Sequence, residues 1–165
     1  MNEAAAAPTE QAEGREAQLA KVPFFDGLTP EALAMIANVT AEEIYPYGSR
    51  LFQYGDPGDK LYIILEGKVR ISREVGGMGE EALAVLGAGE VFGEMALLDE
   101  SPRSAGALAH EKCRVLVITK DAFDDLLFLH KDLAYEVLWS CVRMLATRLR
   151  ETNDKLTFLS TTGRF

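Results

Sequence analysis

The chain has 165 residues, of which 48% are hydrophobic and 26% charged, with a formal net charge of −9. This composition is typical of one soluble globular domain, and the acidic excess argues against non-specific binding to DNA or to an anionic membrane. The sequence has no apolar run near about 18 residues and no charged-then-apolar leader, so it predicts a cytoplasmic protein without a membrane span. Any anionic ligand must therefore be held by local donors in a buried, shaped site.

The N-terminal segment is rich in Ala, Glu and Gln and has almost no large apolar side chain. Such a segment buries too little surface to become ordered, so residues 1–20 are predicted to form a disordered arm, for which transient helix is the alternative. A helix is predicted next, because Thr29 is a good N-cap and Pro30 suits the first helical position. Leu33 and Ile36 fall on one face of this helix, which is expected to close one end of a barrel.

From residue 43 to residue 118 the pattern changes to short stretches with a period of two, separated by Gly and Pro. Several short strands of this kind predict a mainly β fold with flanking helices, in which an antiparallel β-roll (a double-stranded β-helix or jelly roll) occupies residues 21–130. The predicted strands cover residues 44–45, 50–53, 61–65, 68–73, 82–86, 105–109 and 114–118.

The most informative motif lies within residues 92–109 and reads Phe-Gly-Glu-Met-Ala-Leu, followed by Pro-Arg-Ser-Ala. Gly93 permits a tight turn before good helix formers, so the first backbone amides of that helix are expected to be free donors. Such an end attracts phosphate, whereas Glu94 would accept a hydrogen bond from a neutral hydroxyl of the same ligand. Arg103 would close the other side with its planar, bidentate guanidinium group.

This motif resembles the phosphate-binding cassette of the cyclic nucleotide-binding domain family, which includes protein kinase A regulatory subunits and bacterial catabolite activator proteins. Residues 22–25, 55–59 and 67–69 also resemble the family, so the likeness covers roughly residues 22–159. The resemblance implies that Glu94 binds the ribose 2′-OH and that Arg103 binds the exocyclic phosphate oxygens. The implied phosphate and ribose residues are Gly93, Glu94, Met95, Ala96, Arg103 and Ser104, and the implied base or pocket residues are Ile71, Leu83, Leu86, Arg148, Thr152 and Asn153.

After residue 118 the apolar period becomes helical, with Thr119 as the predicted N-cap of a first helix. A long helix is predicted to begin near His130 and, with a short tail, to occupy residues 131–165. Its apolar positions step by three and four over about three and a half heptads, which predicts a coiled-coil homodimer or a helix packed on its own barrel. We call these positions the α-helical seam: Tyr135, Leu138, Val142, Leu145, Leu149, Thr152, Leu156 and Leu159.

Residues 148–155 are similar to the Arg-Leu-x-x-Thr-Ser-Glu-Lys pattern found in the family. Thr152 is accordingly the predicted base contact, and Arg148 is expected to pair with Glu94. Asn153 stands where the pattern has Ser, and a place on the solvated face of the helix is the alternative for it. The chain stops soon afterwards with no room for a helix-turn-helix, so this chain alone is not expected to bind nucleic acid.

Together these features predict a stand-alone sensor of cAMP, or less readily of cGMP, that needs no cofactor, catalyses no reaction and signals through its C-terminal helix to another protein. One alternative is the N-terminal sensor fragment of a catabolite activator protein-like transcription regulator. Another is a cupin-like metal enzyme, but His110 and His130 lie 20 residues apart without a His-x-His pair. Cys113 and Cys141 also lack metal-ligand or disulfide spacing, and they are predicted to be reduced, buried thiols.

Overall fold

The computed structural model describes residues 10–77 and 79–163, and its strands form two four-stranded antiparallel sheets. The first sheet has the order β1 (Ala41–Tyr45), β8 (Cys113–Thr119), β3 (Lys60–Glu66) and β6 (Val91–Phe92). The second has the order β2 (Arg50–Phe52), β7 (Gly106–Ala109), β4 (Val69–Val75) and β5 (Gly79–Leu86). The predicted antiparallel β-roll with flanking helices and a long C-terminal helix is confirmed.

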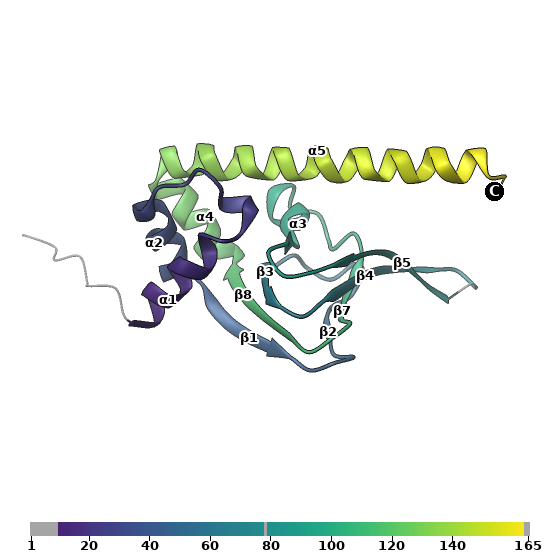
Figure 1. The fold of residues 1–165 in the computed structure, drawn as a ribbon, viewed down its shortest axis with the longest axis horizontal. Coiled ribbons are helices and arrows are strands. Elements are labelled where there is room, and N and C mark those ends of the chain that lie inside the picture. The colour runs from purple at the N-terminus through teal and green to yellow at the C-terminus, as the bar shows by residue number, and fades with distance from the viewer. Residues whose placement is uncertain (1–9, 78, 164–165) are drawn as a thin grey trace, which may run out of the picture.

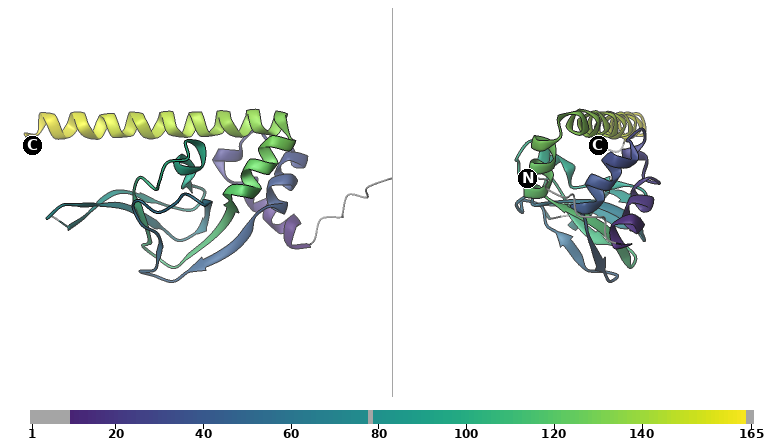
Figure 2. Two further views of the ribbon diagram at one scale, coloured as in Figure 1. Left: turned by 180° about the vertical axis from the view of Figure 1, so that it is seen from behind. Right: turned by 90° about the vertical axis from the view of Figure 1, so that its left-hand side faces the viewer.

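The helices are α1 (Glu10–Leu19), the short 3-10 helix η1 (Pro23–Phe25), α2 (Pro30–Asn38), α3 (Glu94–Leu98), α4 (Lys120–Leu129) and α5 (Lys131–Thr161). Three of them, α1, α2 and α4, lie together at one end of the roll. Helix α5 begins at that end and runs along the length of the roll (Figure 1). The view from behind and the end-on view in Figure 2 show the same arrangement. None of the helices in the described part of the chain has the length and apolar character needed to cross a membrane.

The first sheet is covered on both faces, and its alternation of side chains explains why. On β3, Leu61 and Ile63 pack with the helices, whereas Tyr62 and Ile64 pack against the second sheet. All four side chains are almost completely buried. Because successive side chains of a strand point to opposite faces, β3 contributes to two apolar layers, one between the sheets and one beneath the helices.

Both predicted N-caps close the helices that they precede. The side chain of Thr29 accepts a hydrogen bond from the amide of Ala32 at 3.2 Å, and that of Thr119 accepts one from the amide of Ala122 at 3.3 Å. Each cap satisfies an amide that has no partner inside the helix. The chain therefore turns from β8 into α4 at the residue that the sequence indicates.

Two elements differ from the sequence prediction. The disordered arm predicted over residues 1–20 is wrong for residues 10–19, which form α1, and residues 1–9 lie outside the described residues. The last residue of α1, Leu19, is fully buried, and Arg15 donates a 2.8 Å hydrogen bond to the carbonyl of Thr40. One deep apolar contact and one long-range hydrogen bond thus hold a segment that has few apolar residues. The two-residue strand β6 was also not predicted.

Candidate functional site

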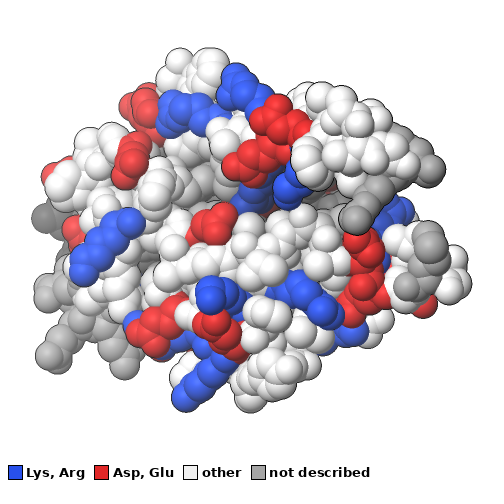
Figure 3. All heavy atoms as spheres, turned by 45° about the vertical axis from the view of Figure 1, so that its right-hand side comes forward, with Lys and Arg blue, Asp and Glu red and all other residues white. Residues whose placement is uncertain are grey.

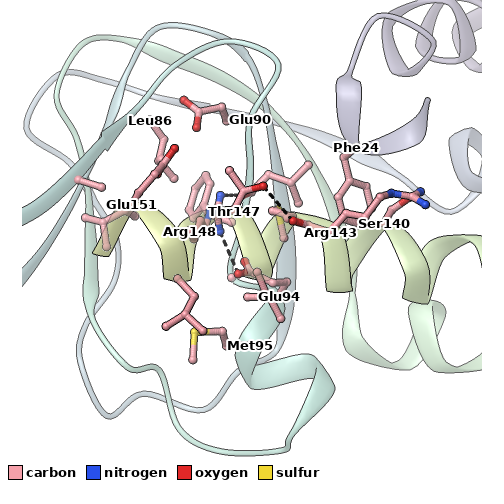
Figure 4. Close-up of a pocket in the computed structure, with 18 of the residues that line it drawn as sticks. Phe24, Leu86, Glu90, Glu94, Met95, Ser140, Arg143, Thr147, Arg148 and Glu151 are labelled. Carbon is pink, nitrogen blue, oxygen red and sulfur yellow. Dashed lines mark hydrogen bonds and ion pairs between the residues drawn. The ribbon is translucent and has the colours of Figure 1, made fainter. Parts of the chain in front are cut away.

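A cavity of about 1230 Å³ lies between α5 and the roll, with walls from β4, β5, β6, α3, η1 and α5. Figure 4 shows α5 crossing this cavity above the start of α3. All but one of the predicted site residues line it: Ile71, Leu83, Leu86, Gly93, Glu94, Met95, Ala96, Arg103, Ser104, Arg148 and Thr152. The tertiary structure therefore brings together residues from four separate parts of the sequence.

Asn153 is the predicted site residue that does not line this cavity. Successive residues of an α-helix are rotated by about 100°, so Asn153 points well away from the side on which Arg148 and Thr152 face the cavity. Its side chain is exposed to solvent. The structure thus departs from the predicted base contact at Asn153 and agrees with the solvated-face alternative.

Two glycines allow the start of α3 to pack closely. Gly93 precedes α3 with a φ of +83°, and a Cβ atom there would lie 2.7 Å from Nη1 of Arg103. A Cβ atom on Gly58 would lie 2.1 Å from the Cβ of Ala96. Because such contacts are far below van der Waals distance, larger residues at these two positions would push α3 away from its neighbours.

Arg103 is the buried cation of the cavity, with only 2% of its surface exposed. Its Nη1 donates to the carbonyl of Gly93 at 2.8 Å, and its Nη2 donates to the carbonyl of Lys60 at 2.7 Å. Nη2 also lies 3.4 Å from a carboxylate oxygen of Asp59. These bonds come from Gly93 at the start of the cassette and from residues 59 and 60 at the start of β3, and they hold the two terminal nitrogens of the guanidinium group.

The charge of Arg103 is incompletely compensated. Asp59 is its one carboxylate partner among the described residues, and 70% of that side chain is exposed, so solvent weakens the attraction. The Nε atom of Arg103 is buried and has no hydrogen-bond partner within the described ranges. A buried donor left in this state costs on the order of 1–3 kcal/mol. An anion in the cavity would complete the pairing of the Arg103 charge.

Glu94 lies on the other side of the cavity and joins α3 to α5. This residue is 4% exposed, and its Oε1 accepts a 2.9 Å hydrogen bond from Nη1 of Arg148, as Figure 4 shows. Arg148 also donates to the carbonyl of Val91 on β6. The predicted pairing of Arg148 with Glu94 is confirmed, and it places an acceptor for a hydroxyl group beside the long helix.

The end of the cavity near the middle of α5 combines apolar walls with one hydroxyl. Leu86 is buried, Ile71 is partly buried and Leu83 is half exposed. Thr152 donates its hydroxyl proton to the carbonyl of Arg148 at 2.8 Å, so its oxygen lone pairs stay available to accept a hydrogen bond. This combination suits a flat, mostly apolar group that carries a donor.

The cysteines are free and buried, as predicted. Burial raises the pKa of the Cys141 thiol to about 11, and the nearby carboxylate of Glu94 adds to this rise. The pKa of Cys113 is also raised, mainly by burial. Both thiols are therefore protonated and unreactive near neutral pH. No group of three or more His, Cys, Asp and Glu side chains in the described ranges is placed to hold a metal ion.

Two contacts of Arg103 were not foreseen from the sequence. The ring of Phe52 on β2 lies beneath the guanidinium group, with its centroid 4.3 Å from Cζ of Arg103. The Asp59 carboxylate reaches the same group from the loop before β3. Local pattern indicated only a strand for residues 50–53, because both contacts join residues more than 40 positions apart.

On the face of the molecule that Figure 3 shows, basic and acidic side chains are interspersed and do not form separate patches of one sign.

Comparisons with known proteins agree with this geometry. A protein-family model described as "Cyclic nucleotide-binding domain" matches residues 42–130, more than half of the chain. The "Cyclic AMP receptor protein" of Thermus thermophilus is 41% identical over 84% of this chain and 62% of its own length. The chain thus spans about three fifths of the length of the first curated relatives that it matches.

Two solved structures extend the comparison. A cyclic nucleotide-binding domain from Methylobacillus flagellatus is 29% identical, with a TM-score of 0.78 over 88% of this chain and 82% of that one. The N-terminal domain of a transcriptional regulator from Streptomyces coelicolor is 34% identical, with a TM-score of 0.69 over 83% of this chain and 95% of that one. A buried arginine and a buried glutamate line one cavity, and the family model matches more than half of the chain. The chain therefore belongs to the cyclic nucleotide-binding domain family.

Proposed function

We propose that this chain binds a cyclic purine mononucleotide, cAMP in preference to cGMP, in the cavity beneath α5. The observation that carries this proposal is the pair of buried, oppositely charged side chains in one cavity, one at the start of α3 and one after it in the chain. Arg103 is a buried guanidinium group in the cavity wall, and among the described residues its charge is opposed by one mostly exposed carboxylate. Glu94 offers a carboxylate to a ribose hydroxyl. A cyclic nucleotide carries both groups a few bonds apart, and the Thermus relative is a cyclic AMP receptor protein.

The preference for adenine rests on the two hydroxyl groups that flank the cavity. Thr152 has lone pairs free for the 6-amino group of adenine. Ser104, which would be the hydroxyl for the 2-amino group of guanine, instead donates a long contact of 3.8 Å to the sulfur of Met95. Serine also lacks the branched methyl group that restricts the rotamer of threonine, so its hydroxyl is less firmly positioned. We therefore expect Ser104 to add little to the affinity for guanine.

Isothermal titration calorimetry of the purified chain with cAMP, cGMP and cyclic dinucleotides tests the proposal. We expect cAMP to bind more tightly than cGMP by about tenfold or less, the scale of one hydrogen bond. We expect cyclic dinucleotides to bind much more weakly. Absence of heat and of competition for every cyclic mononucleotide would remove the proposal, whereas tighter binding of cGMP would reverse only the choice of base.

The contribution of Glu94 to ribose binding can be measured separately from the contribution of the phosphate contacts. If Glu94 accepts a hydrogen bond from the ribose 2′-OH, wild type should bind cAMP about 10- to 150-fold more tightly than 2′-deoxy-cAMP, the range for a hydrogen bond to a charged group. Glu94→Ala should bind the two nucleotides nearly equally. The measurement is a double cycle of protein variant and ligand by calorimetry.

Arg148→Ala is the matched control, because it breaks the Glu94 ion pair while leaving the carboxylate in place. We expect this variant to retain the discrimination between cAMP and 2′-deoxy-cAMP. If Glu94→Ala instead weakens both nucleotides by the same factor, and Arg148→Ala does likewise, then Glu94 acts only by holding α5.

We further propose that α5 transmits the bound state to a partner and forms a homodimer. Beyond Cys141, no residue of α5 is buried within the described part of the helix. Its side-chain hydrogen bonds to the roll there come from Arg148 and, at 3.5 Å, from Lys155 to the carbonyl of Leu83. Few contacts hold this half, so a ligand that touches Glu94 and Thr152 could bias its position.

A second candidate function is the sensor region of a longer transcription regulator. It is supported by the Streptomyces coelicolor domain, which is the N-terminal part of such a regulator and is covered over 95% of its length. The discriminating observation is the native coding sequence after Phe165. A basic helix-turn-helix there would favour the regulator, whereas a stop codon would favour a stand-alone sensor.

A further inference from the structure

The guanidinium group of Arg103 rests on an aromatic cluster formed by Phe52, Tyr62 and Phe92. Phe52 is the nearest ring, with its centroid 4.3 Å from Cζ, and Tyr62 follows at 5.7 Å. Tyr62 and Phe92 stack on each other with centroids 4.9 Å apart, and Phe52 lies 5.6 and 6.1 Å from them. One face of the buried cation is therefore covered by a ring that itself lines the cavity.

The hydrogen bonds of Arg103 leave this face unsupported. The carbonyls of Gly93 and Lys60 bond to the two terminal nitrogens and so hold one edge of the group in its own plane. The ring beneath the guanidinium group opposes rotation about that edge. A desolvated cation over an aromatic face is also stabilised by the negative potential of the ring.

We propose that Phe52 is a positioning residue for anion binding, which holds the guanidinium group of Arg103 flat in the cavity wall. This inference rests on the proposed function, because the phosphate is that of the cyclic nucleotide. Phe52 would act through Arg103 rather than by its own contact with the ligand. Its effect should therefore depend on the presence of an arginine and on the presence of a phosphate.

The experiment is a double-mutant cycle of Phe52→Leu and Arg103→Lys, with cAMP binding measured by calorimetry. Leucine preserves apolar bulk but has no π face, and lysine preserves charge but not the planar fork. We expect Phe52→Leu to weaken cAMP binding about five- to thirtyfold in the wild-type background. In the Arg103→Lys background we expect the same change to alter affinity by no more than about twofold.

Three comparisons separate positioning from packing. Phe52→Tyr keeps the ring and should restore wild-type affinity. Phe92→Leu removes a ring of the same cluster that stacks on Tyr62, whereas Phe52 is the ring nearest to the guanidinium group, so the effect of Phe92→Leu should add to that of Arg103→Lys. Adenosine, which has no phosphate, should bind wild type and Phe52→Leu equally. The inference would be overturned if the loss of cAMP affinity in Phe52→Leu added fully to the loss in Arg103→Lys. It would also be overturned if Phe52→Leu weakened adenosine binding as much as cAMP binding.

A ligand-free readout keeps this inference distinct from the proposed function. In wild type, the side-chain Nε–H of Arg103 is buried near the Phe52 ring, so its NMR signal should exchange slowly and be shifted by the ring current. Phe52→Leu should remove the shift and speed the exchange, whereas Phe92→Leu should not. An unmoved signal in Phe52→Leu would refute the positioning role. Failure of wild type to bind any cyclic nucleotide would refute the proposed function instead.

Discussion

Replacing Arg103 by alanine is expected to weaken cAMP binding by at least about a hundredfold. Charge-assisted hydrogen bonds contribute roughly 1.5–3 kcal/mol each, and a guanidinium group can make two of them to one phosphate. Burial of Arg103 removes competing water and keeps these bonds near the upper end of that range. Arg103→Lys should recover only part of the loss, because an ammonium group cannot reproduce the planar fork. Calorimetry with cAMP is the measurement.

Two controls show whether the loss reflects the phosphate. Arg103→Ala leaves the carbonyls of Gly93 and Lys60 without this donor, so thermal unfolding must show that the variant is still folded at the titration temperature. Arg70→Ala is the matched variant, since Arg70 also has a buried, unpaired Nε but pairs with Glu80 outside the cavity. We expect it to bind cAMP normally. Unchanged cAMP affinity in folded Arg103→Ala would refute the assignment of Arg103 to the phosphate.

A single aspartate in the α-helical seam is expected to convert a dimer into a monomer. Most of the seam is exposed: the side chains that α5 buries include Leu133, Val137 and Cys141, none of which belongs to the seam. The exposed members are Tyr135, Leu138, Val142, Leu149, Leu156 and, less fully, Leu159. A parallel pair of α5 helices would bury this apolar stripe, which is the basis on which we expect a dimer.

Leu156→Asp and Val142→Asp are the cleanest variants, because Leu145 and Leu149 also line the cavity. In a two-fold dimer each substitution buries two unpaired charges, so the dimer dissociation constant should rise by at least about a thousandfold. Light scattering should then report the chain mass instead of twice that mass. Thr152→Ala should keep the dimer and lose about two- to tenfold in cAMP affinity. A wild type that is monomeric at micromolar concentrations with and without cAMP would contradict the homodimer.

Local sequence was sufficient wherever the determining contacts are close along the chain. The caps at Thr29 and Thr119 act on amides three residues away, and the alternation in β3 is a property of consecutive residues. The turn at Gly93 follows from its lack of a Cβ atom and from the helix formers after it. The family motif, carried by Glu94 and Arg103, indicated two residues that the folded chain places in one cavity.

What the sequence by itself determined is therefore the β-roll, the long helix and the chemistry of the cassette; only the tertiary structure decided what supports that chemistry. The anchoring of α1 by Leu19, the ring of Phe52 beneath Arg103 and the close approach of Gly58 to Ala96 all join residues far apart in the chain. Such contacts depend on strand register and on the rotation of α5, which also turned Asn153 away from the cavity. A one-residue shift in the register of β2 would turn Phe52 to the other face of its sheet, and no local pattern encodes that choice.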